Sequence, residues 1–435
     1  MKKFLDYDLI QHAKFLFPFC RSLTGEGVRS TLNYFESFHK ELVRLRYPSG
    51  EKVCDWQIPL EWNIKDSYIQ HIKTGNKYAE FKKSNLHILG YSEPKNEQMG
   101  LKILKKNIYT EPNQPDLIPY VTSYYERNWG FCLSENQKNN LPEGDYKVFI
   151  DSSLKKGFLD MSHAILKGEK KEELFFSSYI CHPSLANNEL SGPIVLNAIL
   201  DYVKSKYPKP KFSYRFVILP ETIGALAYIS KFKQILKKNV IAGINLSCVG
   251  DDRAYSHVKS PYGDTLADEA LSSALINLPN FKEYSFLERG SDERQYCAPG
   301  IRLPLCTFCR SKFGDYPEYH TSGDNFDVVT ESGLQGSLDV IKSIIDAFEI
   351  CLYPLTKVIG EPQLGKRGLY PNISRKVNKG EKHPAKIRKD FLQYADGSNS
   401  IFKISKLISV PLSLCVDEAK TLLSHDLICD KKNEE

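Results

Sequence analysis

The spacing of apolar residues predicts two helices at the start of the chain. Apolar side chains recur every three or four positions through residues 4–45, and this spacing places them on one face of a helix. The polar, glycine-marked stretch 20–29 interrupts the pattern, so we interpret it as the turn between the two helices. Its Arg21 and Arg29 either bind an anion or are surface arginines of the turn.

From Tyr47 the pattern changes to short runs in which apolar and polar residues alternate. A period of two is typical of half-buried strands. The runs that we predict to be strands are Val53–Ile58, Tyr68–Ile72, Tyr78–Phe81 and Leu86–Leu89. Together they predict a small β-rich domain over residues 47–120.

After this region the pattern predicts alternating strands and helices. The predicted strands are Tyr146–Ile150, Leu174–Ile180, Tyr214–Leu219, Val240–Val249 and Leu303–Cys309, and the predicted helices are Pro193–Val203, Ala225–Phe232 and Leu338–Leu352. Such alternation predicts an α/β domain with a largely parallel sheet that helices cover on both faces. We expect the first two helices to pack on the same core, so that this domain comprises residues 1–46 and 121–358. The β-rich domain is then an insertion.

Three short helical patterns follow near the C-terminal end. They are Ala385–Tyr394, Ile401–Leu407 and Val416–His425, and an apolar run, Leu427–Cys429, comes after them. Their spacing is typical of a winged helix-turn-helix module, which we place at residues 359–435. The helix that would enter a DNA groove contains Asp417 and Glu418 and few basic residues. We therefore favour a packing or protein-contact role over nucleic acid binding.

Composition and charge favour a globular protein of two or three domains. The chain has 435 residues, 41% of them hydrophobic and 26% charged. Its net charge of +6 comes from 59 basic and 53 acidic residues that are mixed along the chain, without one basic field for nucleic acid. No apolar run is long enough to span a membrane, and we expect no secretory signal at the charged N-terminus.

The cysteines indicate a reducing compartment. There are eleven, an odd number spread over the whole length, so we expect free thiols and a cytoplasmic location. Cys306 and Cys309 form the one close pair, but no second pair follows at zinc-ribbon spacing. We interpret them as ordinary strand cysteines.

Ionisable side chains cluster where the strands of the predicted sheet end. They occur in four stretches, which are His182 to Glu189, Glu221 with Thr222, Asp251 with Asp252, and Asp315 to Asp324 with His320. The carboxyl ends of parallel strands meet at one edge of a sheet, where ligands bind. A metallohydrolase needs imidazoles and carboxylates around an ion and a free carboxylate that accepts a proton from water. Glu221 is the strongest single candidate, because a carboxylate directly after an apolar strand is costly to bury without a partner.

The order of these stretches resembles a known enzyme group. A histidine, Ala186 to Gly192 with its final Ser-Gly, the run Glu221 to Gly224 and a late histidine are similar to the motifs of the co-catalytic zinc aminopeptidases and carboxypeptidases. With residues 290–297 and 316–322 they resemble more closely the aminopeptidase-like proteins of bacterial polysaccharide-biosynthesis gene clusters. The resemblance covers nearly the whole chain. It implies a three-layer zinc-aminopeptidase-like α/β fold with an inserted small β-rich domain and a C-terminal winged-helix domain.

The resemblance also implies roles for individual residues. His182 and His320 would bind Zn²⁺, and Glu221 would be the general base for the water that attacks an amide carbonyl. Glu189 or Asp251 would add a carboxylate ligand beside the histidines. The expected cofactor is therefore zinc.

Three positions depart from the pattern of the two-zinc enzymes. Asn188 stands where those enzymes have a metal-bridging aspartate, Thr222 where they have a second glutamate, and Ser247 where they have a strand-end aspartate. Neutral side chains cannot offset the charge of two divalent cations. The sequence therefore predicts one zinc rather than two.

The predicted function is that of a metallo-aminopeptidase or related amidohydrolase. Its substrate would be a small peptide or an aminoacyl or acyl amino sugar. Residues that we expect near the substrate are Asn188, Asp292, Glu293, Arg294, Tyr296, Glu318 and Tyr319. The alternative is a catalytically impaired protein of the same fold that binds or regulates through its winged helix. The β-rich insertion either caps the cleft or forms a contact in a homo-oligomer.

Overall fold

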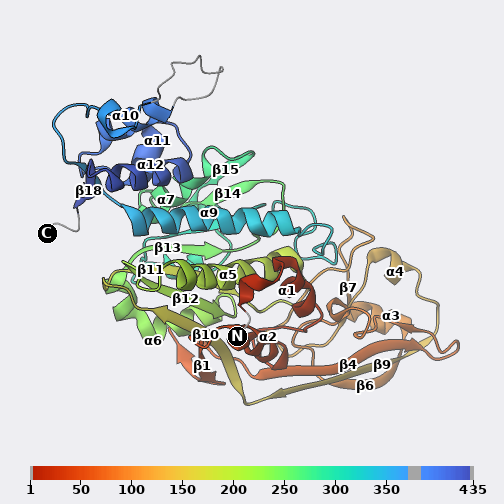
Figure 1. Cartoon of the computed structure of the whole chain (residues 1–435). Coiled ribbons are helices and arrows are strands. Elements are labelled where there is room, and N and C mark those ends of the chain that lie inside the picture. Colours follow the sequence, from red (N-terminus) through yellow and green to blue (C-terminus); the bar gives the residue numbers. More distant parts are fainter. Residues whose placement is uncertain (1–2, 371–383, 432–435) are drawn as a thin grey trace.

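A mixed sheet of eight strands forms the centre of the molecule (Figure 1). The computed structural model describes residues 3–370 and 384–431. In order across the sheet the strands are β1 (Val43–Pro48), β10 (Phe158–Leu166), β12 (Ser213–Leu219), β11 (Glu173–Tyr179), β13 (Val240–Leu246), β16 (Leu305–Cys309), β14 (Tyr255–Val258) and β15 (Phe281–Tyr284). The central strands β12, β11, β13 and β16 run parallel to one another, so their carboxyl ends meet at one edge.

Helices cover both faces of this sheet, as the sequence predicts. One face packs against α1 (Leu9–Leu16), α2 (Glu26–Phe38), α5 (Ser191–Lys206), α7 (Leu266–Leu275) and α9 (Glu331–Ile350), and the other against α6 (Ile223–Asn239) and α8 (Glu293–Tyr296). Strand β11 shows why, because Phe176 is buried in the first core and Phe175 in the second. Both faces of a central strand are apolar when helices lie on each side of the sheet.

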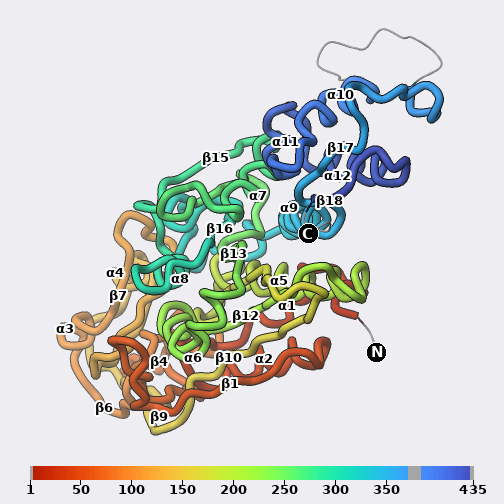
Figure 2. Tube along the Cα trace, turned by 90° about the vertical axis from the view of Figure 1, so that its left-hand side faces the viewer, coloured from red at the N-terminus to blue at the C-terminus, as the bar shows by residue number. Residues whose placement is uncertain are grey.

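A second sheet has four strands and lies at one end of the α/β body. Its order is β5 (Lys77–Tyr78), β4 (Glu61–His71), β9 (Asp145–Lys155) and β6 (Lys95–Gly100). Figures 1 and 2 both place it at the opposite end from the C-terminal helices. The boundaries of the three predicted domains stay a prediction.

Four segments differ from the predicted elements. Residues 86–89, predicted as a strand, begin inside a turn of 3₁₀ helix, η2 (Asn85–His87), because the Ser84 hydroxyl accepts a hydrogen bond from Leu86 N. The run 53–58 is a short hairpin of β2 (Lys52–Val53) and β3 (Trp56–Gln57). Strands β1 and β10, which the pattern did not predict, extend the central sheet in antiparallel fashion.

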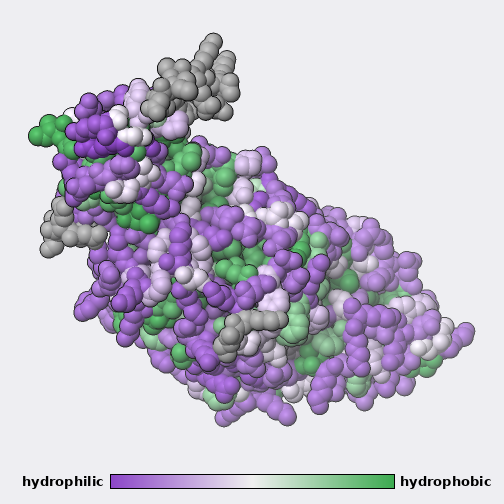
Figure 3. Space-filling view, viewed as in Figure 1, coloured by the Kyte–Doolittle hydropathy of each residue, from purple (hydrophilic) through white to green (hydrophobic). Residues whose placement is uncertain are grey.

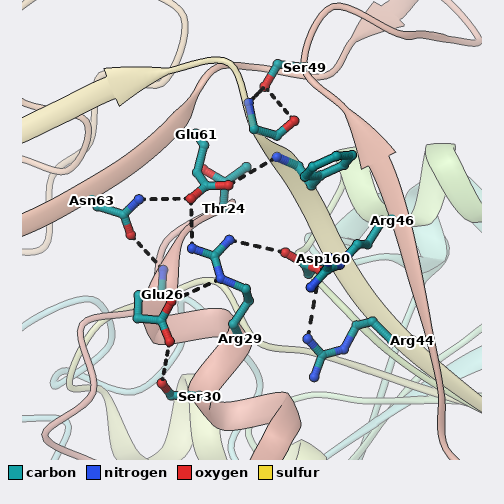
Figure 4. A network of polar contacts seen from close by, with 12 residues as sticks. Thr24, Glu26, Arg29, Ser30, Arg44, Arg46, Ser49, Glu61, Asn63 and Asp160 are labelled. Carbon is teal, nitrogen blue, oxygen red and sulfur yellow. Dashed lines mark hydrogen bonds and ion pairs between the residues drawn. The ribbon is translucent and has the colours of Figure 1, made fainter.

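A polar network fastens α2 to three strands (Figure 4). The Arg29 guanidinium donates to Glu61 of β4 at 2.7 Å and to Asp160 of β10 at 3.4 Å. Asp160 is buried and also accepts from Arg46 of β1 at 2.8 Å. A buried carboxylate that several cations contact is well compensated, so the N-terminal helices are held against the sheet.

The C-terminal region forms helices α10 (Pro384–Tyr394), α11 (Ile401–Leu407) and α12 (Leu412–Ser424) with the strand pair β17 (Pro354–Thr356) and β18 (Ile428–Asp430). Helix α12 lies beside α9 (Figure 1), and its Cys415 and Ala419 belong to the same buried cluster as Ile341. On α12, Glu418 forms an ion pair with Arg388 at 2.8 Å. Residues 371–383 and 432–435, which the predicted winged-helix domain includes, lie outside the described residues.

The surface and the cysteines complete the description. Polar residues cover most of the face seen in Figure 3, and apolar residues gather there in small patches. Within residues 3–370 and 384–431, no helix combines the length and the apolar character needed to cross a membrane. Within the described residues, none of the eleven cysteines forms a disulfide bond, and Cys306 and Cys309 are buried on β16, as predicted.

Candidate active site

The site begins where the neighbouring strands β11 and β12 end. Their parallel register pairs Tyr179 with Leu219, so the residues that follow each strand lie side by side. Donor atoms of Cys181, His182 and Glu221 all lie within 4.8 Å of one another. The sequence predicted this meeting for His182 and Glu221, and the structure adds Cys181, whose sulfur accepts the Glu221 N–H at 3.3 Å.

The second histidine arrives from the loop after β16. The ring centroids of His182 and His320 are 5.2 Å apart, and Tyr319 stacks on His320 at 3.9 Å. His320 has φ 57°, a left-handed conformation that costs energy for a residue with a side chain. Its Nε2 is buried and has no hydrogen-bond partner among the residues described. The histidine pair therefore presents a nitrogen that is free for a ligand.

Tyr120 covers both histidines. Its ring meets those of His182 and His320 edge-on, with centroid distances of 5.0 and 5.2 Å. Its hydroxyl lies 2.8 Å from that of Tyr124, and its backbone N–H donates to the His320 carbonyl at 2.8 Å. Tyr120 belongs to the connection between β7 (Ile108–Tyr109) and β8 (Phe131–Cys132). Part of the predicted β-rich region thus reaches the site.

A fully buried arginine lies behind His182. The side chains of Arg21 and Glu189 are both 0% exposed, and the guanidinium donates to the carboxylate at 3.1 Å. The same Arg21 nitrogen also donates to the His182 carbonyl. The other Glu189 oxygen lies 3.0 Å from His182 Nδ1. The expectation of a surface arginine at position 21 is therefore wrong.

The contact with Glu189 determines which ring nitrogen of His182 is left for the site. A carboxylate only accepts hydrogen bonds, so His182 Nδ1 carries a proton toward Glu189 and Nε2 is left for the site. Burial lowers the pKa of His182, but the hydrogen bond and charge of Glu189 outweigh it, and the pKa lies above its usual value. Glu189 lies in one turn of π-helix, η4 (Ala186–Leu190), a geometry that is frequent at functional sites.

The Tyr179 phenol joins Asn188 and Ser247, the two positions at which the resemblance implies metal-binding aspartates in the two-zinc enzymes. The Tyr179 hydroxyl donates to Asn188 Oδ1 at 3.0 Å and lies 2.8 Å from the Ser247 hydroxyl. All three side chains are buried. This corner of the site is thus held together by neutral groups.

Two carboxyl groups in the site have raised pKa values. Burial raises the pKa of Glu221. Burial and the neighbouring Glu221 raise the pKa of Asp292 well above its usual range. Asp292 Oδ1 accepts the Thr222 N–H at 2.7 Å, whereas Oδ2 is buried without a partner in the described chain. For His320, burial and the charge of His182 lower the pKa to about 3, so its imidazole is neutral at pH 7.

Other residues predicted for the site are engaged in structural contacts. The Asp251 carboxylate accepts hydrogen bonds from Asn187 Nδ2, from the backbone and hydroxyl of Ser311 and from Arg253 N. Glu318 forms a two-pronged ion pair with the Arg253 guanidinium, both contacts being 2.8 Å long. These two acids therefore stabilise neighbouring loops through a shared arginine.

Some residues of the stretch 290–297 lie beside the site, and others belong to the core. Glu293 accepts the N–H groups of its own turn and the hydroxyl of Thr307 at 2.9 Å. Tyr296 is fully buried, with its hydroxyl 3.0 Å from that of Ser177. Arg294 is partly buried and donates to the Thr222 hydroxyl at 2.7 Å. Of this group, Asp292 and Arg294 lie beside Glu221.

Comparisons with known proteins show the family and the fold of the chain. A profile of a family described as a domain of unknown function, DUF4910, matches residues 7–350, and one described as a winged helix-turn-helix matches residues 352–430. The chain belongs to the DUF4910 family. The predictions of an aminopeptidase-like α/β fold and of a C-terminal winged helix are confirmed.

One protein related to this DUF4910 chain comes from Clostridium acetobutylicum. It is provisionally named a polysaccharide biosynthesis protein with an aminopeptidase-like domain. The two are 40% identical over 409 residues, which cover 92% of this chain and 90% of the relative. A crystal structure of a C. acetobutylicum protein, provisionally called a peptidase, superposes with a TM-score of 0.87 at 36% identity, covering 97% of this chain and 95% of the other.

A more distant likeness shows the fold alone. The zinc aminopeptidase of Bacillus subtilis superposes with a TM-score of 0.55 and is 12% identical, over 78% of this chain and 92% of that enzyme. The α/β body of this chain therefore has a fold that this zinc enzyme shares.

Proposed function

We propose that the chain is an amide hydrolase of the aminopeptidase type that works with one zinc ion. His182 and His320 would hold the metal, and Glu221 would act as the general base. The observation that supports this most is the convergence of the two imidazoles and a half-buried carboxyl group at the ends of parallel strands. The fold shared with a zinc aminopeptidase adds to it.

The residues fit a single metal ion. His320 offers a buried, unpartnered Nε2 on a neutral imidazole, which is the form that binds metals. The carboxylate behind His182 resembles the hydrogen-bonded carboxylates that orient metal-binding histidines. Glu189 and Asp251, the predicted carboxylate ligands, use their oxygens elsewhere. The free Asp292 Oδ2 replaces them in our proposal.

Zinc, when bound, supplies Lewis acidity toward a carbonyl oxygen and lowers the pKa of the attacking water. Glu221 contributes the proton acceptor, and its raised pKa brings it closer to neutrality, where general bases work best. Glu189 and Arg21 keep His182 in one tautomer. Tyr120 limits the access of water to the histidines from one side.

The substrate that we propose is a small peptide or an aminoacyl or acyl amino sugar. Hydrolysis of all three breaks an amide bond by the same chemistry. The provisional name of the C. acetobutylicum relative supports a link to polysaccharide biosynthesis.

Metal analysis tests the metal site. We expect full-length protein purified without chelators to contain about one zinc per chain, and His182→Ala and His320→Ala to lose it. His425→Ala changes an exposed histidine after α12 and should leave the zinc content unchanged. Zinc that is absent from the wild type, or that persists in both site variants, would contradict the proposal.

An activity panel tests the reaction. Aminoacyl nitroanilides and N-acyl amino sugars would be assayed with and without added zinc. Turnover that disappears in Glu221→Gln while zinc stays bound supports the base. If the zinc-loaded protein cleaves neither class of substrate, the chain is a catalytically impaired member of its fold. The reason would be the neutral groups Tyr179, Asn188 and Ser247, which contact one another in the site.

A further inference from the structure

A cleft of about 450 Å³ opens beside His320. One wall is the connection after β7, with Glu111, Gln114 and Tyr120, and the other is the loop with Tyr319 and His320. Its size falls within the roughly 300–1,000 Å³ that is typical of small-ligand pockets. Because His320 and Tyr120 also belong to the candidate active site, a group bound in the cleft lies next to the reacting centre.

The walls of the cleft are fixed relative to each other. Gln114 Nε2 donates to the Pro317 carbonyl at 2.6 Å, Ile118 N to the Ser322 hydroxyl at 3.0 Å, and Tyr120 N to the His320 carbonyl at 2.8 Å. Pro119 and Thr321 pair as an isolated antiparallel bridge. The cleft is therefore built before a ligand binds, which lowers the cost of binding.

The lining is polar and lacks cationic groups. Amide and hydroxyl side chains of Thr110, Asn113, Gln114 and Thr321 line it, with Glu111 as the carboxylate. None of the described residues that line the cleft is lysine or arginine. Phosphates and carboxylates are usually bound by such cations, so the lining disfavours an anionic group.

One buried acceptor points to the kind of ligand. Gln114 Oε1 is buried and has no hydrogen-bond partner among the described residues. The orientation of this amide is fixed, because its nitrogen donates to the Pro317 carbonyl, which can only accept. The oxygen is therefore an acceptor that no described residue satisfies. Glu111 is a second acceptor in the same wall.

We propose that this cleft binds a neutral, hydroxyl-bearing ring, a sugar, as the part of the substrate that carries the amide. Sugar hydroxyls supply a donor for Gln114 Oε1 and further donors for the Glu111 carboxylate, whose Oε1 already accepts the Asn113 N–H at 3.1 Å. The rings of Tyr120 and Tyr319 offer apolar surface for the carbon face of the sugar. This assignment rests on the proposed function, because it presumes that the amide reaches His182 and Glu221. It selects the acyl amino sugar from the substrate classes given above.

Binding without turnover tests the cleft. N-acetylglucosamine and alanyl-alanine would be titrated by calorimetry into full-length wild-type protein, once as purified and once with EDTA, which suppresses zinc-dependent hydrolysis. We expect the sugar to bind and the dipeptide to bind at least about tenfold more weakly. Gln114→Ala should weaken sugar binding about tenfold, the effect of one lost hydrogen bond and an emptied contact. Gln234→Ala, an exposed glutamine of α6, is the matched control and should not change it.

The outcomes separate this inference from the proposed function. A dipeptide that binds more tightly than the sugar would make the cleft a peptide subsite and overturn the inference. Equal sugar affinity in Gln114→Ala and the wild type would do so too. The wild-type comparison needs no variant, so it decides the matter even if Gln114→Ala folds poorly. Sugar binding in this experiment, together with no amide hydrolysis by the zinc-loaded protein in the activity panel, would overturn only the proposed function.

Discussion

Replacing Arg21 with methionine tests the buried ion pair behind His182. Methionine keeps much of the length of the side chain but removes its charge and its donors. In the structure those donors contact Glu189 and the carbonyls of Leu16, His182 and Pro183. None of these contacts is replaced when the guanidinium is gone.

The expected loss of stability is large. Removing one partner of a buried ion pair costs about 3–5 kcal/mol, because the remaining charge is left in a medium of low polarity. Each carbonyl that loses its donor adds about 1–3 kcal/mol unless water reaches it. His182 still contacts Glu189 and compensates part of its charge. We therefore expect Arg21→Met to lower the free energy of unfolding by at least about 4 kcal/mol.

Urea unfolding followed by circular dichroism measures this loss by linear extrapolation. Arg127→Met is the matched control, because Arg127 pairs with Glu93 at 3.0 Å but its side chain is 74% exposed. We expect it to cost less than about 1 kcal/mol. The double variant Arg21→Met/Glu189→Gln should recover at least about 2 kcal/mol, since it removes the uncompensated charge. If Arg21→Met costs no more than Arg127→Met, the argument from burial is refuted.

Three further predictions follow from other features. Tyr179→Phe removes the hydroxyl between Asn188 and Ser247 and should lower the stability in urea by about 1–3 kcal/mol; a change below about 0.5 kcal/mol would show that this bridge is unimportant. Burial opposes ionisation of Asp268, but hydrogen bonds from His257, Ser260 and Thr265 lower its pKa to about 2. In the unfolded chain the pKa of this group is about 4, so at higher pH the lowered pKa stabilises the fold by roughly 2 kcal/mol. This contribution is lost as the pH falls toward 2. Asp268→Asn should flatten this acid limb in urea unfolding series, and an unchanged limb would assign it to other carboxyl groups. For the winged helix, we expect a dissociation constant for duplex DNA above about 10⁻⁶ M, measured by fluorescence anisotropy at physiological salt. The reason is that α12 carries Asp417 and the paired Glu418. Tighter, salt-sensitive binding would contradict the packing role.

The elements that the sequence predicted are those with strong local patterns. The apolar run before Glu221 and the one before His182 are strands β12 and β11, and the apolar helix between them in the chain is α5. Strand β10 was missed because its Asp160 looks out of place in a buried strand. The cations that compensate it, Arg29, Arg44 and Arg46, come from other elements. A local pattern cannot show compensation of this kind.

The same distinction holds for the site. His182 and Glu221 directly follow strands, so the edge of the sheet predicts that they meet. Arg21 lies 161 positions from His182 along the chain, and Tyr120 arrives on a connection without regular structure. Only the packing of α1 and of that connection brings them in. The signals that could have indicated them, a charged residue after an apolar helix and an aromatic after Ile-Pro, are too common to single them out.

The wall of the cleft beside His320 has a consequence for how selectivity could change. Residues 110–130 between β7 and β8 contain no helix and no named strand. Most of their side chains are therefore not needed to hold the sheet, and connections of this kind tolerate substitution better than the elements that they join. A library randomised at positions 111, 113 and 114 would alter what fits against His320 while leaving the histidines and Glu221 untouched. Under the proposed function, substrate choice and bond cleavage can then evolve separately.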